Sequence, residues 1–188
     1  MPTMPGQDSP YRDLLLALKP GPVPRDAIAA YRGSCGMPPD GWFASRARLH
    51  MTVFKVSAVH VDRLPELHRL LCAHRMERSD LQVRIPKRAA HVPSLTVKVP
   101  RAWKSFRDGL GQALVASGFS VGGGDSPHIT LSYNFTPVRP RQPFPDIPWT
   151  ATELLLIWSQ LKPDFDWERH VLLERYAALE PAQFCLFA

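Results

Sequence analysis

Two stretches decide the fold of this chain: Arg-Leu-His-Met-Thr-Val-Phe at 48–54 and Ser-Pro-His-Ile-Thr-Leu-Ser-Tyr at 126–133. Each stretch holds a histidine and a threonine two positions apart inside a strongly apolar run. Residues two apart in a β-strand point to the same face of a sheet. The histidine and threonine of each stretch should therefore share a face, while the apolar residues beside them point into a core. We expect the two His-x-Thr strands to meet around one phosphate.

The candidate catalytic residues are His50 and His128, and the candidate phosphate-binding residues are Thr52 and Thr130. Histidine has an ordinary pKa of about 6.5, so that one ring can be neutral and another protonated near neutral pH. Two such rings on opposite sides of a phosphodiester can act as base and acid. Threonine hydroxyls can donate hydrogen bonds to the non-bridging phosphate oxygens. No cluster of metal ligands stands out, so we expect neither a metal nor another cofactor.

A structural role is the competing interpretation, because a His-x-Thr triplet is common and the chain holds seven histidines. A single histidine on an apolar strand is more often structural than catalytic. Two of them in similar surroundings favour catalysis.

Apolar periodicity and breaker residues predict the order of elements along the chain. Strands are expected at 14–18, 45–56, 81–85, 95–99, 126–133, 153–160 and 170–177, and helices at 24–32, 62–74 and 101–117. Five prolines between 136 and 149 indicate an extended crossing segment rather than a helix or a central strand. The glycine run at 122–124 lacks the Lys-Ser/Thr of a P-loop and precedes a strand, so we interpret it as a turn.

A repeat is visible in this order. Strand 14–18, helix 24–32 and the first motif form one unit, and strand 95–99, helix 101–117 and the second motif form another. The repeat predicts an α+β fold with two lobes related by an approximate two-fold axis. That arrangement would bring the motif strands side by side at the centre.

Composition bounds the class of protein. The 188 residues are 45% hydrophobic, enough for one globular domain, which we expect at 11–188 after a flexible tail at 1–10. A net charge of +6 favours anionic partners such as RNA or nucleotides, although a soluble basic surface explains it equally well. The three cysteines lie far apart, which argues against a disulfide framework and a zinc site. Without a membrane-length apolar run or a signal core, we expect a cytoplasmic protein with no membrane partner.

The two motifs, His-Met-Thr-Val at 50–53 and His-Ile-Thr-Leu at 128–131, resemble the paired motifs of the 2H phosphoesterases. The resemblance is to the bacterial 2′-5′ RNA ligase and RNA 2′,3′-cyclic phosphodiesterase branch, and it extends over about 13–176. It implies a bilobal fold with a central cleft and metal-independent hydrolysis of 2′,3′-cyclic phosphates to 2′-phosphates. For some members it also implies reversible 2′-5′ joining of RNA ends. The two histidines would be the acid–base pair, and the two threonines would hold the phosphate.

Further substrate contacts are less well marked. Many 2H phosphoesterases carry an arginine where this chain has Tyr133. Arg46 and Arg48 alternate with the first motif's histidine in the expected strand, so they should point to the same face and could replace that arginine. Trp42, Phe43 and Tyr133 could stack on a base. Ordinary packing explains Trp42 and Phe43 as well as stacking does, and it explains Tyr133 better.

The function expected from these residues is that of a monomeric phosphodiesterase acting on RNA ends or cyclic nucleotides. A non-catalytic RNA or nucleotide-binding module on the same fold is the alternative. A phosphodiesterase for another small cyclic phosphate is a third, because substrate choice depends on loops such as 33–45, 86–93 and 136–149.

Overall fold

The computed structural model describes residues 9–35, 44–84, 94–123, 126–132, 145–160 and 169–180. Three α-helices lie in these ranges: α1 (Pro22–Ser34), α2 (Leu64–Ala73) and α3 (Arg101–Ala116). The strands are β1 (Tyr11–Leu18), β2 (Met51–His60), β3 (Ser79–Arg84), β4 (Ser94–Lys98), β5 (Ser120–Gly122), β6 (His128–Thr130), β7 (Ile147–Ala151), β8 (Glu153–Gln160) and β9 (Arg169–Ala177). None of the helices described is long and apolar enough to cross a membrane.

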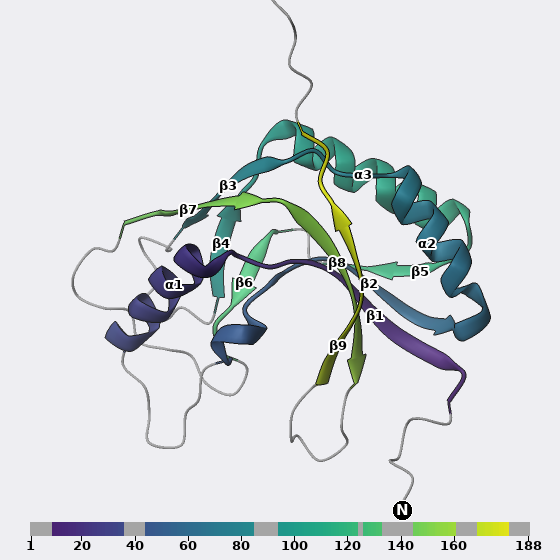
Figure 1. Cartoon of the computed structure of the whole chain (residues 1–188), viewed down its shortest axis with the longest axis horizontal. Coiled ribbons are helices and arrows are strands. Elements are labelled where there is room, and N and C mark those ends of the chain that lie inside the picture. Colours follow the sequence, from purple (N-terminus) through teal and green to yellow (C-terminus); the bar gives the residue numbers. More distant parts are fainter. Residues whose placement is uncertain are drawn as a thin grey trace, which may run out of the picture.

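The strands form one nine-stranded antiparallel sheet that curls into a half-barrel (Figure 1). Their order is β7-β3-β4-β6-β2-β1-β8-β9, and β5 pairs with β2 beside this path. The order is symmetric about the centre, since β4 lies beside β6 as β1 lies beside β2. The α+β fold expected from the repeat is therefore confirmed, and the two motif strands, β2 and β6, are neighbours.

The helices join the two halves of the sheet. Helices α2 and α3 lie side by side outside the curved sheet (Figure 1). Helix α1 follows β1 but lies against β7, and α3 follows β4 but lies against β5, next to β2. Each repeat therefore packs its helix on the half of the sheet that contains the other repeat's strands.

Alternation along β1 separates the two faces of the sheet. Leu16 and Leu18 are fully buried in the main core, which also takes in residues of all three helices. Leu15 and Ala17 point the other way and form a small cluster with β8. We call the face that carries Ala17 the second face.

A glycine follows the end of helix α3. Gly118 has a φ of +72°, its N–H donates to the carbonyl of Val115, and the Phe119 N–H donates to the carbonyl of Leu114 at 3.0 Å. This is the Schellman arrangement, in which glycine adopts the left-handed conformation at little cost.

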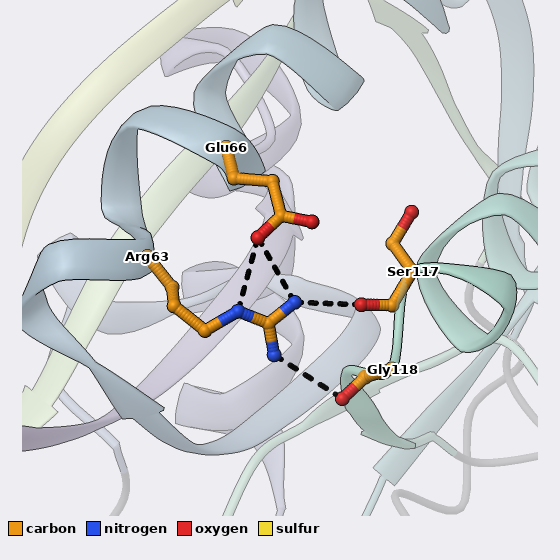
Figure 2. Close-up of polar contacts among 4 residues, drawn as sticks. All are labelled: Arg63, Glu66, Ser117 and Gly118. Atoms are coloured by element: carbon orange, nitrogen blue, oxygen red, sulfur yellow. Dashed lines mark hydrogen bonds and ion pairs between the residues drawn. The ribbon is translucent and has the colours of Figure 1, made fainter.

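Arg63 ties the start of α2 to the end of α3 (Figure 2). Its guanidinium donates to the carbonyls of Ser117 at 2.6 Å and Gly118 at 3.3 Å, and its Nε donates to the Glu66 carboxylate at 3.0 Å. The last carbonyls of a helix lack intrahelical partners and carry partial negative charge. The hydrogen bond from Arg63 also holds the pKa of Glu66 below its ordinary value.

The expected start of one strand was wrong, and two strands were missed. The first motif strand begins at Met51 rather than near 45, because residues Arg46–Arg48 form a 3₁₀ turn. Strand β5 was missed because it has only three residues. Strand β7 was missed because it contains Pro148. It lies at the edge of the sheet, where the N–H that a proline lacks is not needed to pair with a neighbouring strand.

Candidate active site

The two motif strands meet at their buried central residues. Met51 of β2 is paired with Ile129 of β6, and both side chains are 0% exposed. Both belong to the main core, so the residues on either side of each point to the second face. This single pair aligns the two halves of the sheet at its centre.

Continuing that antiparallel register by one residue each way sets His50 opposite Thr130 and Thr52 opposite His128. Residues directly opposite one another have Cβ atoms about 4.5–5.5 Å apart, and diagonal pairs are about 7–8 Å apart. The two histidines lie on one diagonal and the two threonines on the other. The structure thus brings together the four residues predicted from the sequence.

Both histidines are held in the same way. Nδ1 of His50 lies 2.7 Å from the carbonyl oxygen of Arg48, and Nδ1 of His128 lies 2.9 Å from the carbonyl oxygen of Ser126. A carbonyl oxygen only accepts, so Nδ1 carries the hydrogen and donates it. In the neutral ring Nε2 is then the basic nitrogen. Each motif therefore orients its own imidazole through the residue two positions earlier.

A β-bulge lies beside the first motif. Leu16 is paired with Phe54 and Ala17 with Thr52, which leaves Val53 as an extra residue on β2. Bulges change the direction of side chains and are common next to active sites. Here the bulge lets Thr52 point to the second face while Val53 and Phe54 are both buried.

The flanking strands add polar neighbours that sequence reasoning missed. On one side Thr96 of β4 is paired with His128. On the other side Leu18 of β1 is paired with Met51, so the next residue, Lys19, lies beside His50. Nothing in the local sequence marks Thr96 or Lys19, since only strand register brings them to the motifs.

The strand alternation expected for Arg46 and Arg48 was wrong, while their contact with the substrate stays a prediction. They lie in a 3₁₀ turn, where three residues per turn replace the alternation of a strand. Arg46 forms an ion pair with Asp26 of α1, and the backbone carbonyl of Arg48 accepts the hydrogen bond from His50.

The three aromatic candidates, Trp42, Phe43 and Tyr133, lie outside the described residues. Within the ranges described, no group of three His, Cys, Asp or Glu side chains is arranged to hold a metal ion.

The fold is that of Escherichia coli LigT. Its apo crystal structure matches with a TM-score of 0.70 at 20% identity, over 90% of this chain and 99% of LigT. The complex of LigT with 3′-AMP matches with a TM-score of 0.70 at 19% identity, over 89% of this chain and 98% of LigT. TT0787 of Thermus thermophilus matches with a TM-score of 0.64 at 20% identity, over 88% of this chain and 97% of that protein.

A further crystal structure with the same architecture, named a phosphoesterase, matches with a TM-score of 0.70 at 20% identity over 90% of this chain. No protein-family model and no curated protein matches the sequence. The fold implied by the two short motifs is therefore confirmed by three-dimensional similarity to LigT and to a phosphoesterase.

Proposed function

We propose that this chain is a phosphodiesterase that hydrolyses 2′,3′-cyclic phosphates of RNA ends or nucleotides to 2′-phosphates without a metal. The observation that carries the proposal is the diagonal pair of histidines, each donating from Nδ1 to a carbonyl two residues earlier. The LigT-like fold supports a phosphoesterase, and LigT crystals contain 3′-AMP, phosphate, ATP or NADP⁺.

In the proposed reaction one histidine takes a proton from water at Nε2 as the water oxygen attacks phosphorus. The bond from phosphorus to the ribose 3′ oxygen breaks, and the other histidine donates a proton to that oxygen. The product carries a 2′-phosphate and a 3′-hydroxyl. Thr52 and Thr130 donate hydrogen bonds to the non-bridging oxygens, whose charge grows in the transition state.

The same residues could also join RNA ends. A 5′-hydroxyl in place of water would attack phosphorus and leave a 2′-5′ phosphodiester with a free 3′-hydroxyl. The two histidines exchange roles when this step runs backward, so neither is base in both directions.

The test is hydrolysis of adenosine 2′,3′-cyclic phosphate with EDTA present. Replacing His50 or His128 by Ala should lower kcat by about 10²-fold or more. His60→Ala is the matched control, because His60 lies at the far end of β2 and contacts Asp62 instead. Thermal unfolding of each variant shows whether a loss of rate is a loss of fold.

Two results would contradict the proposal. One is hydrolysis by both histidine variants at the wild-type rate. The other is tight binding of the 2′-phosphate product or of RNA without turnover, which would make the chain a binding module.

A further inference from the structure

Near His50 lies a group of four basic residues that the proposed reaction does not use. We call Lys19, Arg25, Arg48 and Arg175 the cationic cluster. They come from four different parts of the chain: the end of β1, the first turns of α1, the turn before β2, and β9. Strand register places Lys19 and Arg175 on the second face, and the charges of Arg25 and Arg48 act on Lys19.

Register defines the centre of the cationic cluster. Leu18 is paired with Met51, which sets Lys19 opposite His50 one strand away, about 5 Å between strands. On the other side of β1, Ala17 is paired with Leu155, so Glu153 follows opposite Lys19. Lys19 therefore lies on the second face between the proposed catalytic strand and β8.

The outer part of the cluster comes from β9. Arg175 is paired with Leu155 and forms an ion pair with Glu153 at 2.5 Å. Glu153 thus brings a carboxylate to this part of the second face, where it is paired with Arg175. The cationic cluster adjoins the proposed reaction site.

Burial and neighbouring positive charges act together on Lys19. Burial, followed by the charges of Arg25, Arg175 and Arg48, lowers the pKa of Lys19 below its ordinary value, while Glu153 opposes the change. The Nε atom of Arg25 is buried without a hydrogen-bond partner. An anion beside Lys19 and Arg25 would offset the repulsion between them and accept the hydrogen bond that Arg25 Nε lacks.

We infer that the cationic cluster binds a second phosphate of the substrate, next to the phosphate that reacts at the two histidines. The inference rests on the proposed function and narrows its substrate class. A 2′,3′-cyclic phosphate ends a chain, so the nearest other phosphate is on the 5′ side of the same nucleoside. The preferred substrates are therefore RNA ends or 5′-phosphorylated nucleotides rather than nucleoside cyclic phosphates without a 5′-phosphate.

The experiment compares adenosine 2′,3′-cyclic phosphate with the same compound carrying a 5′-phosphate. Wild type should prefer the 5′-phosphorylated substrate by about 10-fold in kcat/KM, the effect of one charge-assisted contact. Lys19→Met should remove most of this preference, chiefly through KM, and Lys19→Arg should keep it. Arg175→Met, at an exposed position, should reduce the preference too.

Lys104→Met is the matched control, because Lys104 is an exposed lysine on α3. It should leave the kinetics of both substrates unchanged. Equal use of both substrates by wild type would overturn the inference. So would a preference that survives in both Lys19→Met and Arg175→Met.

A binding measurement separates this inference from the proposed function. Adenosine 3′,5′-bisphosphate should bind wild type more tightly than adenosine 3′-monophosphate, and Lys19→Met should lose most of the difference. If this holds without any turnover, the hydrolysis proposal fails and the phosphate subsite stands. If turnover occurs but the 5′-phosphate has no effect on rate or binding, the subsite fails alone.

Discussion

At the scale of single residues, the hydroxyl groups of Thr52 and Thr130 are the most specific part of the proposed mechanism. Each is half-buried on the second face and lies opposite the other motif's histidine in the continued register. A hydroxyl that donates to a developing phosphate charge acts in the transition state more than in the bound substrate.

We therefore expect Thr52→Val to lower kcat by about 10–10²-fold while the melting temperature stays close to wild type, since valine keeps the shape and removes the donor. Thr52→Ser, which keeps the hydroxyl, should recover most of the rate. Steady-state hydrolysis of adenosine 2′,3′-cyclic phosphate measures both. Similar rates in Thr52→Val and Thr52→Ser would show that the hydroxyl does not act on the phosphate.

At the scale of elements, the close approach of α3 to β2 depends on a glycine. A Cβ added at Gly111 would lie 2.9 Å from Cζ of Phe54, a buried residue two positions after Thr52. A Cβ at Gly109, on the same helix, would have no heavy atom within 4 Å. The two glycines therefore separate helix propensity from packing.

We expect Gly109→Ala to raise the free energy of unfolding by about 0.5–1 kcal/mol, because alanine favours the helix. Gly111→Ala should lose this gain and fall below wild type, because the Phe54 ring must move. Urea unfolding followed by circular dichroism gives both values. If the two substitutions stabilise equally, α3 does not press on β2 at this point.

Arg63 joins the start of α2 to the end of α3 and makes the stability of this junction depend on pH. The pKa of Glu66 is lowered in the folded state, chiefly by the hydrogen bond from Arg63. The ionised Glu66 carboxylate therefore stabilises the folded state fully above the ordinary pKa of Glu, about 4.3. This stabilisation is lost as the pH falls through the lowered pKa of the folded state.

We expect Arg63→Met to be less stable than wild type at pH 7, because the carbonyls of Ser117 and Gly118 lose a donor. The difference should shrink as the pH is lowered below about 4, because wild type then loses the Glu66 contribution. Melting temperatures between pH 3 and pH 7 measure this. A constant difference over the range would contradict the role given to Glu66.

At the scale of the whole molecule, the two halves of the sheet are aligned at the centre by the pair of Met51 and Ile129. The proposed site takes one histidine and one threonine from each half. Its geometry therefore depends on how the halves are held together, and the core at this junction has a second role besides stability.

We expect Met51→Ala and Leu114→Ala each to lower the free energy of unfolding by about 2–5 kcal/mol, since both side chains are 0% exposed. Only Met51→Ala should also lower kcat at a temperature where every protein is fully folded, because Leu114 is on α3, away from the junction. An unchanged kcat in Met51→Ala would show that the junction does not set the site.

Most elements could be predicted from the sequence because their signals are local. The alternation in β3 and β4, the apolar stripe of α3 and its stop at Gly118 all depend on residues a few positions apart. The same local logic failed at Arg46 and Arg48, where a strand pattern was extended into a 3₁₀ turn. It also missed β7, because a proline excludes a central strand but not an edge strand.

The sequence by itself determined the motif strands, the α+β class and the four candidate site residues, because period-two alternation assigns each histidine and threonine to one face. Tertiary structure alone decided which residues of the two strands oppose one another, how far the first strand extends, and that Lys19 lies beside His50. The physical reason is that register and packing join residues far apart in the chain, and no short stretch of sequence contains both partners of such a contact.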